Sequence, residues 1–214
     1  MRYAGVMTST VNARTGRAPV AGLLLAAGGG RRLGGRPKAL LPHRGGLLVE
    51  HALRVLREGG CGPVHVVLGA GAEKVRARLG PAAGVVLVDH PGWADGMGTS
   101  LRAGLASLTA AGTDASAALV ALVDQPRVGA RAVARVLAAH REGAELAAAA
   151  YEGVRGHPVL LAREHWDGVA RAATGDRGAR DYLRQHASLV RLVECSDVAA
   201  PDDVDTPDDL ALLD

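Results

Sequence analysis

The stretch Leu24–Pro42, LLAAGGGRRLGGRPKALLP, decides the fold of this chain, because a glycine-rich loop directly follows an apolar run that is typical of a buried strand. The three glycines at 28–30 lack a Cβ, so the backbone can turn sharply there and point several N–H groups at an anion. Arg32 and Lys38 add positive charge in the same loop. We therefore expect a polyphosphate site directly after the first strand.

Two better-known glycine loops do not match this stretch. The mononucleotide P-loop ends in Gly-Lys-Ser or Gly-Lys-Thr, whereas Lys38 follows Pro37 and precedes Ala39. The dinucleotide-binding fingerprint needs a third small residue at the position that Leu33 occupies. The loop therefore belongs to neither motif.

The composition of the chain favours one domain that binds a small anion. Its 214 residues suffice for one sizeable core, and 48% of them are apolar. The net charge of +3 comes largely from scattered arginines, and no basic run is interleaved with aromatic residues, so the sequence does not indicate nucleic-acid binding. No apolar stretch approaches the roughly 20 residues that cross a bilayer, so we expect no membrane association.

The cysteines and the N-terminal residues bear on location and domain boundaries. Cys61 and Cys195 show neither metal-ligand spacing nor a disulfide pattern, so we expect reduced thiols and a cytoplasmic protein. The apolar run Val20–Ala27 leads straight into the glycine loop, which favours a strand over a signal-peptide core. Residues 1–18 are small, polar and aperiodic, so we expect a disordered N-terminal tail and one folded domain over residues 19–214.

Strand and helix patterns alternate along the chain. The strand patterns are continuously apolar, which is typical of a mostly parallel sheet covered on both faces. The sequence therefore predicts a single-domain, doubly wound α/β fold. We expect strands at Val20–Ala27, Pro63–Gly69, Gly84–Asp89, Ala117–Val123 and Leu189–Glu194, and helices at Leu47–Glu58, Ala72–Leu79, Ser100–Leu108, Ala130–Arg141, Glu164–Ala172 and Ala179–His186.

Two further segments carry less regular patterns. Ala144–Tyr151 contains four consecutive alanines, which favour a helix by propensity. Its position between a helix and the RGHPVLL segment favours a strand, and we expect a strand. Near the C-terminus, Thr206 as N-cap, Pro207 at the first helical position and Asp209 at the third predict the start of a last helix.

Carboxylates follow the ends of the expected strands, where open α/β sheets bind ligands. Asp124 directly follows Ala117–Val123, and a hard oxygen ligand there suits a Mg²⁺ ion carried in on a triphosphate. The alternative is an aspartate that opens the turn before Pro126. Asp205 is the second candidate metal ligand, and its alternative is a solvated acid just ahead of Thr206.

The segment Gly96–Ser100, GMGTS, leads into an expected helix. Its free backbone N–H groups and hydroxyls can hydrogen-bond a nucleobase or a sugar. The alternative is a helix N-cap at Thr99 or Ser100. Trp93, just before it, either walls the pocket or fills a loop, while Arg31 in the glycine loop is expected to be exposed.

Six ordered blocks of this chain resemble the nucleotidyltransferase family typified by the molybdenum-cofactor cytidylyl- and guanylyltransferases. The family loop reads LAAG, a short spacer, Arg-Met/Leu-Gly and then Lys. The resemblance continues through GWADGMGTSLRAGL, LVDQP, RGHPVL, TGDRGAR and DVDTPDDL, and covers nearly the whole chain after residue 19. In the loop, the family positions are occupied by Gly28, Gly30, Arg32, Leu33, Gly34 and Lys38.

This resemblance implies a Rossmann-like, GT-A-like nucleotidyltransferase domain. It implies Mg²⁺-dependent transfer of a nucleotidyl group from a nucleoside triphosphate to the phosphate of a molybdopterin cofactor, with release of pyrophosphate. The LAAG form of the loop favours CTP, and a molybdoenzyme or its maturation factor is the implied protein partner. Arg32 and Lys38 would neutralise charge on the leaving pyrophosphate, and Asp205 would help Asp124 to hold the metal. The implied nucleotide-binding residues are Ala26, Ala27, Gly28, Gly30, Lys38, Gly96, Met97 and Ser100.

The second half of the chain is where the resemblance implies the acceptor. A phosphomonoester attracts arginines because their planar guanidinium groups donate two parallel hydrogen bonds. The alternative for His157 is that it holds the loop before Pro158. The expected acceptor-binding residues are Arg155, Gly156, His157, Arg177 and Arg180.

Two other functions fit the same fold. One is an NAD(P)H-dependent reductase, and the other is a non-catalytic carrier of molybdopterin. The presence of Lys38, Asp124 and Asp205 together counts against the carrier. Transfer needs no general base, because a phosphate nucleophile is already largely ionised at neutral pH.

Overall fold

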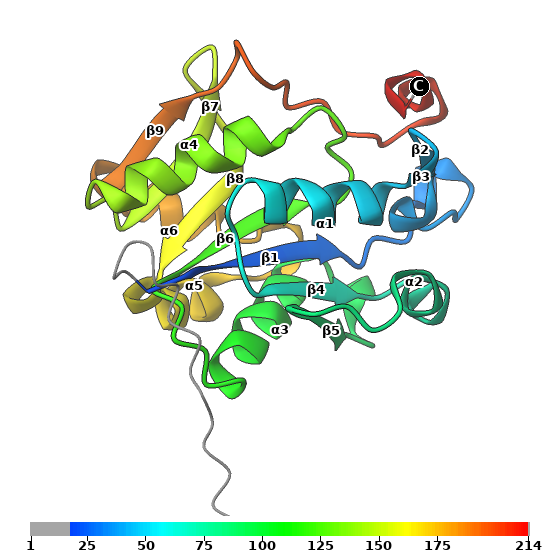
Figure 1. The fold of residues 1–214 in the computed structure, drawn as a ribbon, viewed down its shortest axis with the longest axis horizontal. Coiled ribbons are helices and arrows are strands. Elements are labelled where there is room, and N and C mark those ends of the chain that lie inside the picture. Colours follow the sequence, from blue (N-terminus) through cyan, green and yellow to red (C-terminus); the bar gives the residue numbers. More distant parts are fainter. Residues whose placement is uncertain (1–17, 214) are drawn as a thin grey trace, which may run out of the picture.

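A computed structural model of the chain describes residues 18–213. All but the last residue of the predicted N-terminal tail lies outside the described residues. Seven strands form one sheet in the order β5-β4-β1-β6-β8-β7-β9 (Figure 1). The strands are β1 Val20–Ala26, β4 Val64–Leu68, β5 Val85–Asp89, β6 Ala117–Leu122, β7 Leu146–Tyr151, β8 Val154–Ala162 and β9 Val190–Glu194.

The predicted fold class is confirmed, because the sheet is mostly parallel and helices cover both of its faces. β8 alone runs antiparallel to its neighbours β6 and β7, whereas the other paired strands of this sheet are parallel. Helices α1 and α4 cover one face, and α3, α5 and α6 cover the other (Figure 1). The helices are α1 Leu48–Glu58, α2 Ala72–Leu79, α3 Met97–Ala110, α4 Ala130–Arg141, α5 Trp166–Ala172 and α6 Arg180–Gln185.

The central strand β1 is buried because its side chains alternate between two apolar layers. Leu24 packs with α1 and α4, and Leu23 packs with α3 and α5 on the other face. Full burial of such a leucine contributes about 1.5–3 kcal/mol to folding. Gly104 lets α3 lie directly on β1, since a Cβ there would overlap the side chain of Leu23. The first strand is therefore held rigidly beneath the loop that follows it.

The alanine-rich segment is a strand, as expected. β7 is fully buried between β8 and β9, and its side chains alternate between the core beneath α4, which Ala147 and Ala149 join, and the core on the other face, which Ala148 joins. β7 and β8 form a hairpin whose two turn residues, Glu152 and Gly153, have φ of 53° and 77°. Helix propensity is outweighed here because sheet pairing on both sides satisfies the backbone.

Several helix starts differ from the prediction. α3 begins at Met97 rather than Ser100, with Gly96 as its N-cap residue, so neither Thr99 nor Ser100 is the cap. α5 is preceded by the 3-10 turn Arg163–His165. The last predicted helix is a 3-10 helix, Pro207–Leu213, at the C-terminal end near β2 (Pro42–His43) and β3 (Gly46–Leu47) (Figure 1). Among the described residues, none of the helices has the length and apolar character needed to cross a membrane.

Candidate active site

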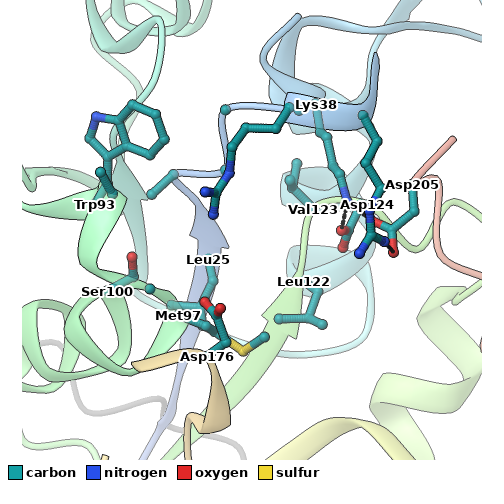
Figure 2. A pocket seen from close by; sticks show the side chains of 18 residues that line it. Leu25, Lys38, Trp93, Met97, Ser100, Leu122, Val123, Asp124, Asp176 and Asp205 are labelled. Carbon is teal, nitrogen blue, oxygen red and sulfur yellow. Dashed lines mark hydrogen bonds and ion pairs between the residues drawn. The ribbon is translucent and has the colours of Figure 1, made fainter. Parts of the chain in front are cut away.

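A cavity of about 650 Å³ opens beyond the carboxyl ends of β1 and β6. Figure 2 shows Trp93 on one side of it, Lys38 with Asp124 and Asp205 on the opposite side, and Asp176 below. The glycines at 28–30 also line the cavity, between these groups. Polar groups from segments far apart in sequence therefore surround one space, as expected for the ligand edge of an α/β sheet.

The glycine loop follows β1, and its three glycines have different surroundings. Gly30 has φ 59°, and a Cβ there would overlap the carbonyl oxygen of Arg36, so this position requires glycine. At Gly29 a Cβ would come within 2.7 Å of the ring of Trp93. At Gly28 nothing lies within 4 Å of such a Cβ, so the backbone faces open space. Trp93 thus lines the cavity and also packs on the loop.

Lys38 brings two of the candidate carboxylates together. It lies in the 3-10 turn Lys38–Leu40, and its side chain is only 14% exposed. Its ammonium nitrogen lies 2.6 Å from Oδ2 of Asp124 and forms a second hydrogen-bonded ion pair with Asp205. The exposed Arg32 approaches the same group, with its guanidinium nitrogen 3.7 Å from Oδ2 of Asp205. Arg31 lies at the rim and is exposed, as expected.

The C-terminal segment reaches the site through backbone contacts. The N–H of Val204 donates to the carbonyl oxygen of Asp124 at 2.9 Å, which places Asp205 beside the end of β6. The carboxylate of Asp209 accepts hydrogen bonds from the N–H groups of Asp205 and Thr206, at 3.0 and 2.7 Å. The side chain of Asp209, rather than that of Thr206, therefore anchors the turn that presents Asp205.

The negative charges of Asp124 and Asp205 compensate the positive charge of Lys38. Partial burial would lower the pKa of Lys38, but the charges and hydrogen bonds of Asp124 and Asp205 outweigh it and raise the pKa above its ordinary value. Burial raises the pKa of Asp203, opposed by a hydrogen bond from Gln125 and reinforced by the charges of Asp124 and Asp205. The lysine is therefore fully charged at neutral pH.

The donor set fits a hard divalent cation. Asp124 and Asp205 converge on one ammonium nitrogen, so their oxygens also converge on one position that a small cation can share. Carboxylate oxygens are the ligands that Mg²⁺ and Mn²⁺ prefer. Asp203 lies nearby and was not singled out from the sequence. The sequence could have indicated Asp203, because it stands two residues before Asp205 in an extended segment and residues with this spacing share a face.

The helix start at Met97 forms the wall beside Trp93. Gly96 has φ 107°, and a Cβ there would come within 2.5 Å of the carbonyl carbon of Gly175. Met97 and Ser100 both line the cavity, and Ser100 is buried. The structure therefore places these three expected nucleotide-binding residues at one cavity with Lys38.

A second cavity, of about 340 Å³, adjoins the first. Met97 and Asp176 line both cavities. The floor of the second cavity is apolar, and all five expected acceptor-binding residues line it, namely Arg155, Gly156, His157, Arg177 and Arg180. Burial lowers the pKa of His157 to about 4, against an opposing effect of the charge of Asp124, so this imidazole is neutral at neutral pH.

A family model described as the MobA-like NTP transferase domain matches residues 22–190. In sequence, the chain is 44% identical over 201 residues to a protein of Paenarthrobacter nicotinovorans named nicotine blue oxidoreductase, across 91% of this chain and 96% of that protein.

In structure, the chain resembles Rv0371c of Mycobacterium tuberculosis with a TM-score of 0.77 and 31% identity, across 92% of this chain and 97% of that one. A structure of Rv0371c in complex with manganese matches with a TM-score of 0.71 and 30% identity, across 92% and 98% of the two chains. A divalent metal has thus been seen bound to a similar protein.

Proposed function

We propose that this chain, a nucleotidyltransferase that belongs to the MobA-like NTP transferase family, transfers CMP from CTP to the terminal phosphate of molybdopterin. An oxygen of the acceptor phosphate attacks the α-phosphorus of CTP, the bond from that phosphorus to the bridging oxygen breaks, and pyrophosphate leaves. The proposal rests on one observation above all. Lys38, Asp124 and Asp205 meet at the mouth of a cavity that adjoins a second, arginine-lined cavity.

The first cavity is assigned to the nucleotide. The backbone of residues 27–30 and the start of α3, which line this cavity, are assigned to the base and sugar, and Lys38 and Arg32 are assigned to the phosphates; Ala26 is buried in β1 and does not line the cavity. Their charges offset the negative charge that develops on the departing pyrophosphate. We propose CTP rather than GTP as the substrate, because the LAAG loop resembles that of the cytidylyl branch of the family.

Asp124 and Asp205 are assigned to Mg²⁺, which would screen the charge of the triphosphate. The ammonium of Lys38 and the metal both need these carboxylates, so we expect Lys38 to exchange at least one of them for a phosphate oxygen when the nucleotide binds. This exchange keeps the lysine charge compensated in both states, which avoids the cost of an unpaired, half-buried charge.

The second cavity is assigned to the acceptor. Arg155, Arg177 and Arg180 lie around its polar side, and its apolar floor includes Leu101 and Val159. This combination suits a molecule with a flat ring system, which can lie on apolar side chains, and a phosphate. We place the enzyme in the cytoplasm, where its two buried free thiols are stable, and expect it to deliver its product to a molybdoenzyme or a maturation factor.

Two measurements test this proposal. A thermal-shift panel of CTP, GTP, ATP, UTP, NADH and NADPH, each with Mg²⁺, identifies the nucleotide because a ligand of the native state raises Tm by mass action. Release of pyrophosphate from CTP in the presence of molybdopterin then tests the reaction. We expect the largest shift with CTP and pyrophosphate in equal amount to product. Stabilisation by NADH or NADPH alone, without pyrophosphate release, would overturn the proposal.

An NAD(P)H-dependent reductase is the second candidate function. The observation that favours it is the 44% identity of this chain to a protein named as an oxidoreductase. A mononucleotide cavity of about 650 Å³ can be recruited for half of a dinucleotide. A fall in nicotinamide absorbance with nicotine blue as acceptor would identify this activity. The pairing of Lys38 with two aspartates favours transfer.

A further inference from the structure

A second group of metal-ligating side chains lies at the opposite end of the sheet from the cavities described above. Glu145, Glu164 and His165 each bring one donor atom to within 4.8 Å of the others. Glu145 directly precedes β7, and the other two lie in the 3-10 turn that follows β8. Antiparallel pairing brings these segments together, because the N–H of Ala162 donates to the carbonyl oxygen of Glu145 at 2.8 Å.

The imidazole of His165 is held in place from its far side. Its side chain is only 10% exposed, and its Nδ1 lies 2.8 Å from the hydroxyl oxygen of Tyr182. The ring of Tyr182 is itself fixed by stacking on His186 with centroids 4.1 Å apart. The other nitrogen, Nε2, points toward the carboxylate of Glu145 at 3.3 Å. Histidines that bind metals characteristically have such an outer partner on the nitrogen that does not bind the metal.

We propose that Glu145, Glu164 and His165 bind a divalent transition-metal ion, with Zn²⁺ the best match. An imidazole nitrogen with two carboxylate oxygens suits zinc, whereas the all-oxygen pair in the active site suits Mg²⁺. Donors of tetrahedral zinc lie about 3.3–3.6 Å apart. The side chains of both glutamates are exposed, so they can rotate and bring their oxygens about one ångström closer to the separation that zinc requires. The buried histidine stays fixed.

The hydrogen bonds of His165 leave Nε2 as the nitrogen that a metal can reach. Nδ1 is engaged by the hydroxyl of Tyr182, and Nε2 faces the carboxylate of Glu145, which only accepts, so a bound ion would take the place of the proton between Nε2 and that carboxylate. The two glutamates line a cavity of about 400 Å³ at this end of the sheet, which gives the ion a path from solvent.

The ion would be a structural metal and would take no part in catalysis. It would tie the start of β7 to the turn after β8 and, through Tyr182, to α6. Helix α6 begins at Arg180, which lines the acceptor cavity. We therefore expect the metal to stabilise the part of the chain that carries this arginine.

Titration of Zn²⁺ alone tests the site without nucleotide or activity. In the full chain carrying both Asp124→Asn and Asp205→Asn, the two carboxylates assigned to the active-site metal are removed, and we expect one equivalent of Zn²⁺ by calorimetry. At a hundredfold excess over Kd, Tm should rise by about 5–10 °C. Adding Glu164→Gln should remove the rise. The matched control, Glu142→Gln, changes an exposed carboxylate that pairs with Arg191 and should retain it.

The wild-type chain provides a second form of the test in case the double variant does not fold. In wild type we expect two equivalents of Zn²⁺, and one equivalent with Glu164→Gln. X-ray absorption of Zn²⁺ bound to the Asp124→Asn, Asp205→Asn variant should show one imidazole nitrogen ligand. Retention of full Zn²⁺ stoichiometry and full Tm rise in Glu164→Gln would overturn the proposal. The absence of a second equivalent in wild type would do the same, and neither result bears on nucleotidyl transfer.

Discussion

The ammonium nitrogen of Lys38 lies 2.6 Å from the carboxylate of Asp124, although 86 residues separate them. The same nitrogen pairs with Asp205, so a half-buried lysine is neutralised by two acids, one just after β6 and the other in the C-terminal segment. Burial of such a charge without partners costs several kcal/mol. The contact therefore stabilises the fold and keeps a cation and two candidate metal ligands at the mouth of the larger cavity.

Replacing Asp124 with Asn should abolish metal-dependent turnover while leaving the fold intact, because Asp205 still pairs with Lys38. We expect a loss of about a hundredfold or more in kcat at saturating Mg²⁺. Pyrophosphate release measures it, with circular dichroism as the check on folding. Asp202→Asn, which changes an exposed partner of Arg127, should leave turnover unchanged. Near-normal activity in Asp124→Asn would show that this carboxylate does not hold the metal.

Lys38→Ala should lower kcat by about a hundredfold, because the charge acts on the departing pyrophosphate as a preorganised electrostatic group. KM for CTP should rise as well. Lys74→Ala is the matched control, since Lys74 is exposed on α2 and is the other lysine of the chain. A rise in KM alone would mean that Lys38 binds ground state and transition state equally, contrary to the proposed role.

Arg155→Ala and Arg180→Ala should weaken the pterin acceptor and leave CTP affinity nearly unchanged. Both arginines line the second cavity, and neither lines the first. Titration calorimetry with CTP and Mg²⁺ measures the affinity for the nucleotide, and KM for the acceptor reports how well the acceptor binds. Arg191→Ala, at an exposed ion pair on β9, is the control. A loss of CTP affinity as large as that of Lys38→Ala would contradict this division of the site.

Substitutions at Gly30 and Gly28 should differ sharply. Alanine at Gly30 meets the carbonyl oxygen of Arg36 and must adopt φ 59°, which by itself costs about 1–2 kcal/mol. We expect a lower Tm and weaker CTP binding. Alanine at Gly28 meets no atom within 4 Å, so Tm should hold. Equal Tm values for the two variants in thermal unfolding would show that the loop does not need its left-handed turn.

Acid should destabilise the protein in part through His51. Burial lowers its pKa to about 4, reinforced by the charges of His43 and Arg54 and opposed by the hydrogen bond to the carbonyl of Pro126. The unfolded chain, with the ordinary value of 6.5, takes up the proton first. The contribution of His51 is therefore complete above about pH 6.5 and falls by up to about 3 kcal/mol as the pH approaches 4.

Urea unfolding at pH 7 and pH 5 measures this effect. His51→Gln should reduce the difference in unfolding free energy between the two pH values, because glutamine does not titrate and can still donate to Pro126. An unchanged difference in the variant would assign the acid sensitivity to other groups.

The sequence by itself determined most of the strands and helices and their order. Continuous apolar runs marked the parallel strands, and the glycine loop marked the phosphate-binding turn, because these signals lie in neighbouring residues. Even the strand at Ala144–Tyr151 followed from its position between neighbouring elements. Six ordered motifs also identified the family.

Only the tertiary structure decided which side chains meet. The order of the sheet, with β8 antiparallel, brings the RGHPVL segment beside the end of β6. The hydrogen bond from Val204 to Asp124 brings Asp205 to Lys38, and Trp93 explains the glycine at position 29. The physical reason is that local patterns report backbone preference and burial, whereas a contact between distant residues depends on how the whole sheet is assembled.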